Sequence, residues 1–191
     1  MQASDWHVTD PARLATVIRL RAVRMVAPLG FGYLGQALSS AEQVAALFTV
    51  MRPGRDRLVC SPGHYVIGIF AASAELGILS EDQAAGYGQD GSPVEAIGTE
   101  RSPVADYVCG SLGQGLSAAA GFALSDRLKG IDRRTFAMVS DGNSDARAGP
   151  GRPRASTGGP GGAEAGAGGA QGYRHCNGGT DVAHLARRGP R

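Results

Sequence analysis

Residues 109–142, "CGSLGQGLSAAAGFALSDRLKGIDRRTFAMVSDG", contain a glycine-rich turn, a helix and a strand in that order. The small apolar segment at 116–130 predicts a closely packed helix, and "RTFAMVS" at 134–140 has the composition and length of a central strand. The strand runs into Asp141 and Gly142, so it delivers a carboxylate at its C-terminal end. This order predicts an α/β domain with a mostly parallel sheet, whose ligand sites lie at the C-terminal ends of the strands.

The segments before residue 109 continue the alternation of helices and strands. Apolar residues at helical spacing predict helices over 11–27 and 66–77, and "DRLVC" at 56–60 predicts a buried strand that ends in a Ser-Pro-Gly turn. Two further helices are expected to start at capping boxes, one at Ser40 with Gln43 and one at Ser80 with Gln83.

The 191 residues suffice for one domain with a sizeable core, but the composition changes along the chain. Of the 30 glycines, 13 follow residue 142, where Leu, Ile, Val and Phe become rare. Such a composition cannot bury enough apolar surface to offset the entropy of ordering the chain. We therefore expect a partial domain over 1–145 and a disordered Gly/Pro/Ala/Arg-rich tail over 146–191.

Charge and hydropathy exclude several classes of protein. The net charge is only +2 and the tail carries seven arginines, so nucleic-acid binding is not indicated. The start lacks a signal-peptide pattern, and no apolar run reaches the roughly 18 residues of a membrane-spanning helix. The three cysteines are widely spaced, which fits free, buried thiols: Cys60, Cys109 and Cys176. We therefore expect a cytoplasmic enzyme.

The glycine-rich turn before residue 116 is a candidate anion site. Glycine lets the backbone approach a ligand closely, and a helix N-terminus offers free N–H groups to a phosphate or diphosphate. No Gly-Lys-Ser/Thr follows, so this is not a Walker loop, and a turn that only permits tight helix packing explains the glycines equally well. Asp141 adds a carboxylate suited to Mg²⁺, the usual companion of a diphosphate.

Residues 10–142 resemble the N-terminal, cofactor-binding half of transketolases, especially those encoded as two subunits. The resemblance rests on "LGQALSSAEQVAALF", "RDRLVCSPGHY", "GSLGQGLSAAAGFAL" and "VSDG" in the right order and spacing. It implies a three-layer thiamine diphosphate-binding fold with Mg²⁺ or Ca²⁺, and transfer of a two-carbon ketol unit between sugar phosphates or related ketoses. It also implies a separate C-terminal, pyrimidine-binding subunit and hence a hetero-oligomer, without which this chain has no turnover.

The resemblance also assigns roles to individual residues. Asp141 corresponds to the metal ligand, and His64 of "SPGHY" corresponds to a histidine near the diphosphate and the reacting ketol. A histidine suits that place because it can donate a hydrogen bond or carry a proton near neutral pH. The remaining positions correspond to the cofactor-binding turns: Gly110, Ser111, Leu112, Gly113 and Gly142.

Two substrate-facing positions depart from the family pattern. Tyr33 of "GYLG" and Thr99 of "GTE" stand where transketolases commonly have histidines. A specialised ketose is therefore expected in place of the usual pentose phosphates. Ser140 also replaces a glycine that commonly precedes the metal-binding Asp.

The family motif ends after Asp141-Gly142. Neither the expected Glu-Gly-Gln-Val-Trp-Glu-Ala nor a well-placed second metal ligand follows. If Arg147 to Gly151 were encoded CGG GCA GGT CCG GGA with A next, the shifted frame would read Gly-Gln-Val-Arg-Glu. We hypothesise that the tail is an out-of-frame translation, which would leave the strand at 134–140 with an exposed apolar edge.

Three other interpretations fit parts of the pattern. An inactive remnant or scaffold is favoured by the missing ligand, and another thiamine diphosphate enzyme, such as a deoxyxylulose-phosphate synthase or a decarboxylase, shares the diphosphate and metal elements. The pattern "GFGYLG" fits a dinucleotide fingerprint, but the segment before it is helical and contains Pro28, where a buried strand would be needed.

Overall fold

A four-stranded sheet forms the middle layer of the domain. In the computed structural model, which describes residues 6–111, 113–140 and 180–185, the strand order is β2-β1-β3-β4. Strands β1 (Arg57–Cys60), β2 (Tyr107–Val108) and β3 (Thr135–Ser140) are parallel. Strand β4 (Thr180–Leu185) pairs with β3 in the antiparallel direction. The predicted α/β domain with a mostly parallel sheet is confirmed.

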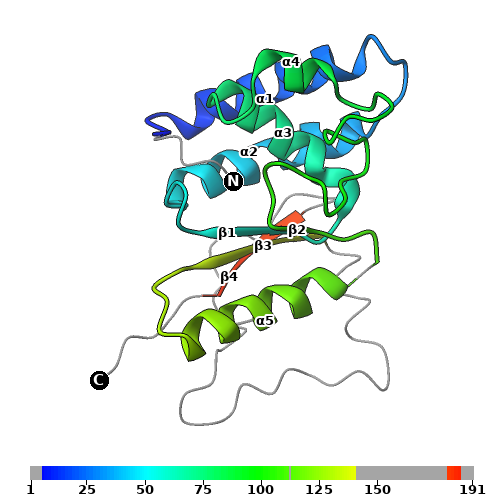
Figure 1. The fold of residues 1–191 in the computed structure, drawn as a ribbon. Helices are drawn as coiled ribbons and strands as arrows, with labels where there is room; N and C mark the ends of the chain where they lie inside the picture. Colours follow the sequence, from blue (N-terminus) through cyan, green and yellow to red (C-terminus); the bar gives the residue numbers. More distant parts are fainter. Residues whose placement is uncertain (1–5, 112, 141–179, 186–191) are drawn as a thin grey trace.

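Helices cover both faces of the sheet. Helices α1 (Pro11–Val26), α2 (Leu34–Val50), α3 (Val66–Glu75) and α4 (Glu81–Ala85) lie on one side. Helix α5 (Gln114–Leu128) lies alone on the other side, and the short 3-10 helix η1 (Gly63–Tyr65) leads into α3 (Figure 1). The three layers predicted from the resemblance are therefore present.

The core lies mainly between the sheet and α1, α2 and α3. All six residues of β3 are buried, as are the last three of β1, as expected for strands with a layer on each face. Helix α3 is buried from Val66 to Ala74, so it is apolar on every side. On the other face a smaller cluster forms where Ala119 of α5 meets Val59, Ala137 and Val139.

Several helix boundaries follow from local signals, but one prediction was wrong. The Ser80 capping box is formed, with its hydroxyl accepting from the N–H of Gln83. Ser40, in contrast, lies inside α2, which begins at Leu34, and its hydroxyl donates to the carbonyl of Gln36 at 2.7 Å. The six residues from Leu34 to Ser39 continue the helix, and Ala37 within them is fully buried, so packing extends α2 beyond the capping signal.

Within the segment expected to form the tail, the structure describes only residues 180–185, which form β4. Six residues of β4 pair with β3, from Ser140 opposite Thr180 to Thr135 opposite Leu185. The buried β3 would otherwise have an unpaired row of N–H and C=O groups, and pairing with any extended segment satisfies them. The proposed domain boundary at residue 145 and the rest of the tail fall outside the described residues.

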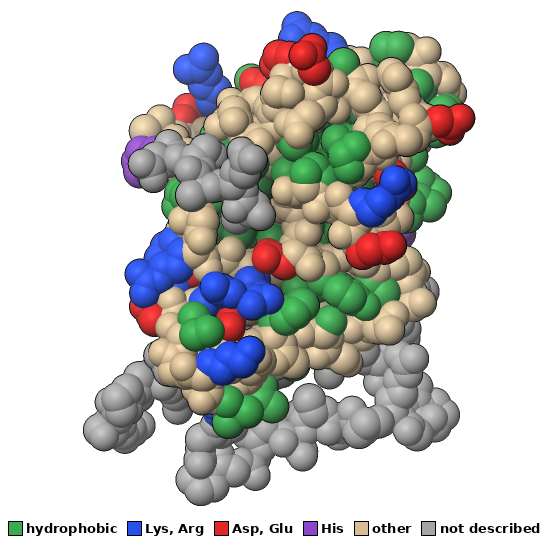
Figure 2. All heavy atoms as spheres, viewed as in Figure 1, with side chains coloured by type: hydrophobic (Ala, Val, Ile, Leu, Met, Phe, Trp, Pro, Cys, Tyr) green, Lys and Arg blue, Asp and Glu red, His purple; other side chains and the backbone are tan. Residues whose placement is uncertain are grey.

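Other expectations from composition can be compared with the fold. Cys60 and Cys109 are free and buried as predicted, while Cys176 lies outside the described residues. Within the described chain no helix is long and apolar enough to cross a membrane. Figure 2 shows basic side chains intermixed with acidic ones on the face viewed, in line with ion pairs such as Arg55 with Asp132.

Candidate functional site

Three predicted motifs meet at one edge of the sheet. Strand β1 leads into the turn that carries His64, β2 leads into the glycine-rich turn, and β3 ends at Ser140, immediately before Asp141. Because the three strands are parallel and adjacent, their C-terminal ends share an edge. Ligands of open α/β sheets bind at this edge.

Backbone hydrogen bonds join the turns to one another. The N–H of Gly63 donates to the carbonyl of Cys109 at 2.9 Å, and the N–H of Gly98 donates to the carbonyl of Gly63 at 3.1 Å. On the opposite side, the N–H of Ser61 donates to the carbonyl of Met138 in β3 at 2.9 Å. The His64 turn is thus fixed between the glycine-rich turn, the loop around residue 98 and β3.

Gly115 lets α5 approach the His64 turn closely. A Cβ at Gly115 would lie 2.7 Å from the Cα and 2.6 Å from the Cβ of Ser61, distances that a real Cβ does not reach. From the sequence, Gly115 belongs to the candidate anion turn. In the structure it allows α5 to pack against the His64 turn. Ser61, which sequence reasoning overlooked, is the residue against which it packs.

The first residues of the glycine-rich turn are open, whereas Gly113 is buried. Gly113 precedes α5 with φ +78°, a left-handed conformation that favours glycine, and a Cβ at Gly110 would meet nothing within 4 Å. Gly110 and Ser111 are exposed, whereas Leu112 lies outside the described residues. An open backbone turn before a 15-residue helix suits a diphosphate, because the first N–H groups of a helix lack intrahelical acceptors and carry partial positive charge.

Buried thiols support this edge without being reactive candidates. The Cys109 thiol donates to the carbonyl of Ser111 at 3.2 Å and lies 3.2 Å from Oε1 of Gln114, so it joins the turn to the start of α5. Complete burial raises the pKa of the Cys60 thiol to about 12. Cys60 is therefore a structural thiol at neutral pH.

His64 lies between two aromatic rings. Its ring centroid is 5.4 Å from that of Tyr33 and 4.9 Å from that of Tyr65. The imidazole is half-buried, and burial lowers the pKa of His64. It is therefore uncharged at neutral pH, and an uncharged imidazole can both donate and accept a hydrogen bond.

One of the two departures from the family pattern contacts His64, and the other lies in a loop that is bonded to the His64 turn. Tyr33 contacts its ring, and Thr99 directly follows Gly98, whose N–H is bonded to Gly63. The Thr99 hydroxyl donates to the carboxylate of Glu95, which also forms an ion pair with Arg101. The sequence shows the two substitutions, but it does not show that Tyr33 contacts His64.

The predicted metal ligand falls beyond the described part of the site. Asp141 and Gly142 follow the last described residue of β3 and lie outside the described residues. Among the described residues, no group of three or more His, Cys, Asp and Glu side chains could hold a metal ion. A pocket of about 220 Å³ lies between α1 and α4, near Arg21, Arg24 and Tyr87, and is separate from the strand ends.

Comparison with known proteins identifies the domain. The family model for the transketolase thiamine diphosphate-binding domain matches residues 11–144. A transketolase family protein of Sinorhizobium fredii is 38% identical over 149 residues, which cover 73% of this chain and 53% of the relative. The 6-deoxy-6-sulfo-D-fructose transketolase subunit of a Clostridium species is 35% identical over 146 residues, covering 71% of this chain and 53% of that subunit.

Solved structures show the same fold. A transketolase variant from Pichia stipitis superposes with a TM-score of 0.64 at 26% identity, covering 70% of this chain and 23% of the enzyme. The Campylobacter jejuni transketolase gives a TM-score of 0.65 at 22% identity, covering 73% of this chain and 24% of that enzyme.

The open glycine turn and the enclosed His64 at the C-terminal edge of the sheet agree with these matches. The chain spans about half the length of these two curated relatives. The matched region includes every described strand end that forms the site, together with the helices on both faces of the sheet. The chain therefore belongs to the transketolase family and carries its thiamine diphosphate-binding domain.

Proposed function

We propose that this chain is the thiamine diphosphate-binding subunit of a split transketolase. Together with a separate C-terminal, pyrimidine-binding subunit, it transfers a two-carbon ketol unit between sugar phosphates or related ketoses. The observation that carries the proposal is the meeting of the His64 turn, the Gly110–Gly113 turn and the end of β3 at one sheet edge. Relatives named as transketolase subunits, from Clostridium and from Phocaeicola vulgatus, support a two-chain enzyme.

The glycine-rich turn is the proposed binding site for the diphosphate. Gly110, Ser111 and Gly113 offer backbone groups before α5. Leu112, which lies outside the described residues, is the fourth residue of this turn proposed to bind the cofactor. Thiamine diphosphate supplies the nucleophilic carbon and the electron sink for ketol transfer. The role of the turn is to hold the diphosphate where N–H groups and the helix dipole favour negative charge.

Asp141 is the proposed ligand of Mg²⁺ or Ca²⁺, with Gly142 beside it. Hard divalent ions prefer carboxylate oxygen, and Mg²⁺ is commonly bound by one or two carboxylates together with phosphates. β3 supports this assignment because its last described residue, Ser140, ends at the same edge as the glycine-rich turn.

His64 is the proposed catalytic residue of this half of the site. An uncharged imidazole can donate a hydrogen bond to a ketose oxygen or accept a proton from a hydroxyl group. Burial, which lowers the pKa of His64, keeps it uncharged at neutral pH. Tyr33 and Thr99 beside it support a specialised ketose, and the relatives' names include different sugars, 6-deoxy-6-sulfo-D-fructose and apulose 4-phosphate.

Calorimetry with thiamine diphosphate and Mg²⁺ tests the proposal. We expect the chain to bind the cofactor only when the divalent ion is present, and Asp141→Ala to lose that binding. Asp82→Ala, which removes an exposed carboxylate in the first turn of α4, is the matched control and should bind as the unmodified chain does. Metal-independent binding, or equal binding by both variants, would refute the metal assignment.

A second candidate, an inactive remnant, is favoured by the missing motif after Asp141-Gly142. Repeating the calorimetry with a chain whose reading frame is restored after residue 145 separates the two. Binding by the restored chain alone identifies the 191-residue chain as inert. Finding that no reading frame of the locus encodes the motif would remove the frameshift hypothesis.

Turnover and location complete the proposal. We expect no ketol transfer by this chain alone, because the pyrimidine half of the cofactor site belongs to the partner subunit. Free, buried Cys60 and Cys109 support a reducing compartment, and the cytoplasm is the proposed location. Ketol transfer by the purified chain without a partner would contradict the two-subunit proposal.

A further inference from the structure

The surroundings of His64 contain one aromatic residue that comes from a distant part of the sequence. Tyr65 follows His64 directly, but Tyr33 precedes α2 and is brought to the imidazole by the fold. The rings of Tyr33 and His64 are inclined by 48° with their centroids 5.4 Å apart, a distance within the range of ring-to-ring contact. Tyr33 therefore covers part of the imidazole that would otherwise face water.

The backbone before Tyr33 is fixed, so this contact does not depend on a free loop. Gly32 has φ +142°, a conformation that side chains rarely adopt. A Cβ at Gly32 would lie 3.0 Å from a methyl carbon of Val26 and 3.3 Å from the hydroxyl oxygen of Tyr87. The turn is thus held between the end of α1 and the buried Tyr87, and α2 begins immediately after Tyr33.

The two residues that depart from the family pattern differ in the groups that their side chains contact. The Thr99 hydroxyl is hydrogen-bonded to Glu95, whose carboxylate is also paired with Arg101. Thr99 thus belongs to a separate polar cluster on the loop between α4 and β2. Tyr33 is the one of the two whose side chain contacts the imidazole itself.

We propose that Tyr33 is a positioning residue that holds the His64 imidazole in one orientation and shields it from water, so that a ketose hydroxyl meets a fixed imidazole. This inference rests on the proposed function for the identity of the ketose, but the contact between Tyr33 and His64 exists in the unliganded chain. Among the described residues, the titratable side chains with a ring contact to the imidazole are the phenols of Tyr33 and Tyr65. Cys109 is linked to this turn through its carbonyl, which accepts from the N–H of Gly63, and Glu95 through Thr99.

NMR of the full chain with labelled histidine tests the positioning role without cofactor or partner. His64→Gln assigns the His64 signals among the four histidines. We expect cross-relaxation between the ring protons of Tyr33 and His64 in the unmodified chain. In Tyr33→Ala we expect the His64 ring protons to move toward their free-solution positions and the pKa of His64 to rise toward its ordinary value, because the imidazole gains water.

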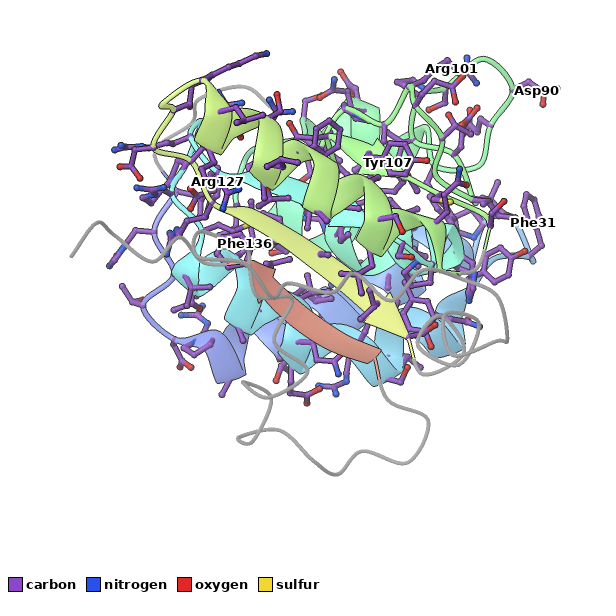
Figure 3. The ribbon with its side chains drawn as sticks, turned by 90° about the horizontal axis from the view of Figure 1, so that it is seen from below. Phe31, Asp90, Arg101, Tyr107, Arg127 and Phe136 are labelled. Carbon is purple, nitrogen blue, oxygen red and sulfur yellow. The ribbon has the colours of Figure 1, made fainter. Side chains whose placement is uncertain are left out.

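Two further variants separate ring contact from general disturbance. Tyr33→Phe keeps the ring and should retain the His64 signals and titration. Phe31→Ala removes a 54% exposed aromatic side chain from the same turn and should leave them unchanged. Figure 3 shows Phe31 at the end of the molecule toward which β3 points, opposite Arg127 near the end of α5, so the control lies at the same end as the site.

The outcomes are decisive. Absence of cross-relaxation between the two rings overturns the proposal even if Tyr33→Ala fails to fold, and so does an unchanged His64 titration in a folded Tyr33→Ala. With a partner subunit, the acid limb of the kcat/KM profile should move to higher pH in Tyr33→Ala and be restored in Tyr33→Phe. If the unmodified pair has no turnover, the proposed function fails, while the NMR result still decides the role of Tyr33.

Discussion

The carboxylate of Asp56, at the N-terminal edge of the sheet, joins two elements that position the site. It is 4% exposed and accepts bonds from the backbone N–H and guanidinium groups of Arg52 and Arg134. Arg52 follows α2 and Arg134 precedes β3, so Asp56 joins the helical layer to the strand that leads to Asp141.

Removing this carboxylate should be costly. Asp56→Asn removes the buried negative charge that both guanidinium groups share, so we expect a loss of about 3–5 kcal/mol in the free energy of unfolding at pH 7. Urea unfolding of the full chain measures it. Asp132→Asn removes a carboxylate that is 58% exposed and should change stability by less than about 0.5 kcal/mol. A similar loss of stability in both variants would contradict the prediction that the buried carboxylate contributes more than the exposed one.

The same residue predicts a pH dependence. Burial raises the pKa of Asp56, but the hydrogen bonds from Arg52 and Arg134 outweigh it and lower the pKa from 3.8 to about 2. A lowered pKa in the folded state contributes stability above the ordinary carboxyl pKa, and that stability is lost as pH falls toward 2. The contribution is about 2 kcal/mol at neutral pH. The stability difference between the unmodified chain and Asp56→Asn should therefore shrink between pH 4 and pH 2, as followed by urea unfolding.

Two glycines of α5 should respond oppositely to the same substitution. Gly115→Ala forces a methyl group onto the backbone of Ser61 and should lower the free energy of unfolding by about 1–3 kcal/mol. On the same helix, a methyl group at Gly121 would meet nothing within 4 Å, so Gly121→Ala should raise the free energy of unfolding by up to about 1 kcal/mol. Urea midpoints of the two variants measure this. If Gly115→Ala were as stable as Gly121→Ala, the close approach of α5 to the His64 turn would be wrong.

At the scale of elements, local sequence decided some boundaries and packing decided others. The N-cap Asp10 of α1 accepts from the N–H of Arg13, and the capping box of α4 forms at Ser80, so both starts could be read from the sequence. The start of α2 at Leu34 could not, because the side chain of its N-cap residue, Tyr33, makes no capping bond. Strand β2 is only two residues long and was not predicted, since its pairing with β1 depends on a distant partner.

The capping box of α4 offers a direct test at this scale. Ser80→Ala removes the acceptor for the N–H of Gln83 and should cost about 1 kcal/mol of unfolding free energy. Ser39→Ala, at an exposed position of α2 whose hydroxyl only bonds the carbonyl of Gln36, is the matched control and should change little. Equal thermal midpoints for the two variants would contradict the capping role.

For the whole molecule, the pairing of β3 with β4 decides how much of the sheet is covered. Ending the chain after residue 145 removes β4 and leaves β3, buried along all six residues, as an open edge strand. We expect the shortened chain to aggregate at concentrations where the full chain remains monodisperse, as measured by light scattering. Hydrogen exchange of the β3 amides should also be faster. A shortened chain that remains monodisperse with protected β3 amides would show that β4 does not protect this edge.

The sequence by itself determined the fold class and the turns that carry the site, which depend on local signals such as helical spacing, strand composition and glycines before a helix. The three layers were implied by the resemblance to the transketolase family. Only the tertiary structure decided what the individual residues do there. It separated the packing role of Gly115 from the open Gly110, placed Tyr33 against His64, tied Thr99 to Glu95 and paired β3 with residues 180–185. Most of these contacts join residues from different elements, and the contrast between the two glycines separates residues that look alike in sequence. Spacing along the chain cannot predict them, because which distant atoms meet is decided only when apolar surfaces pack.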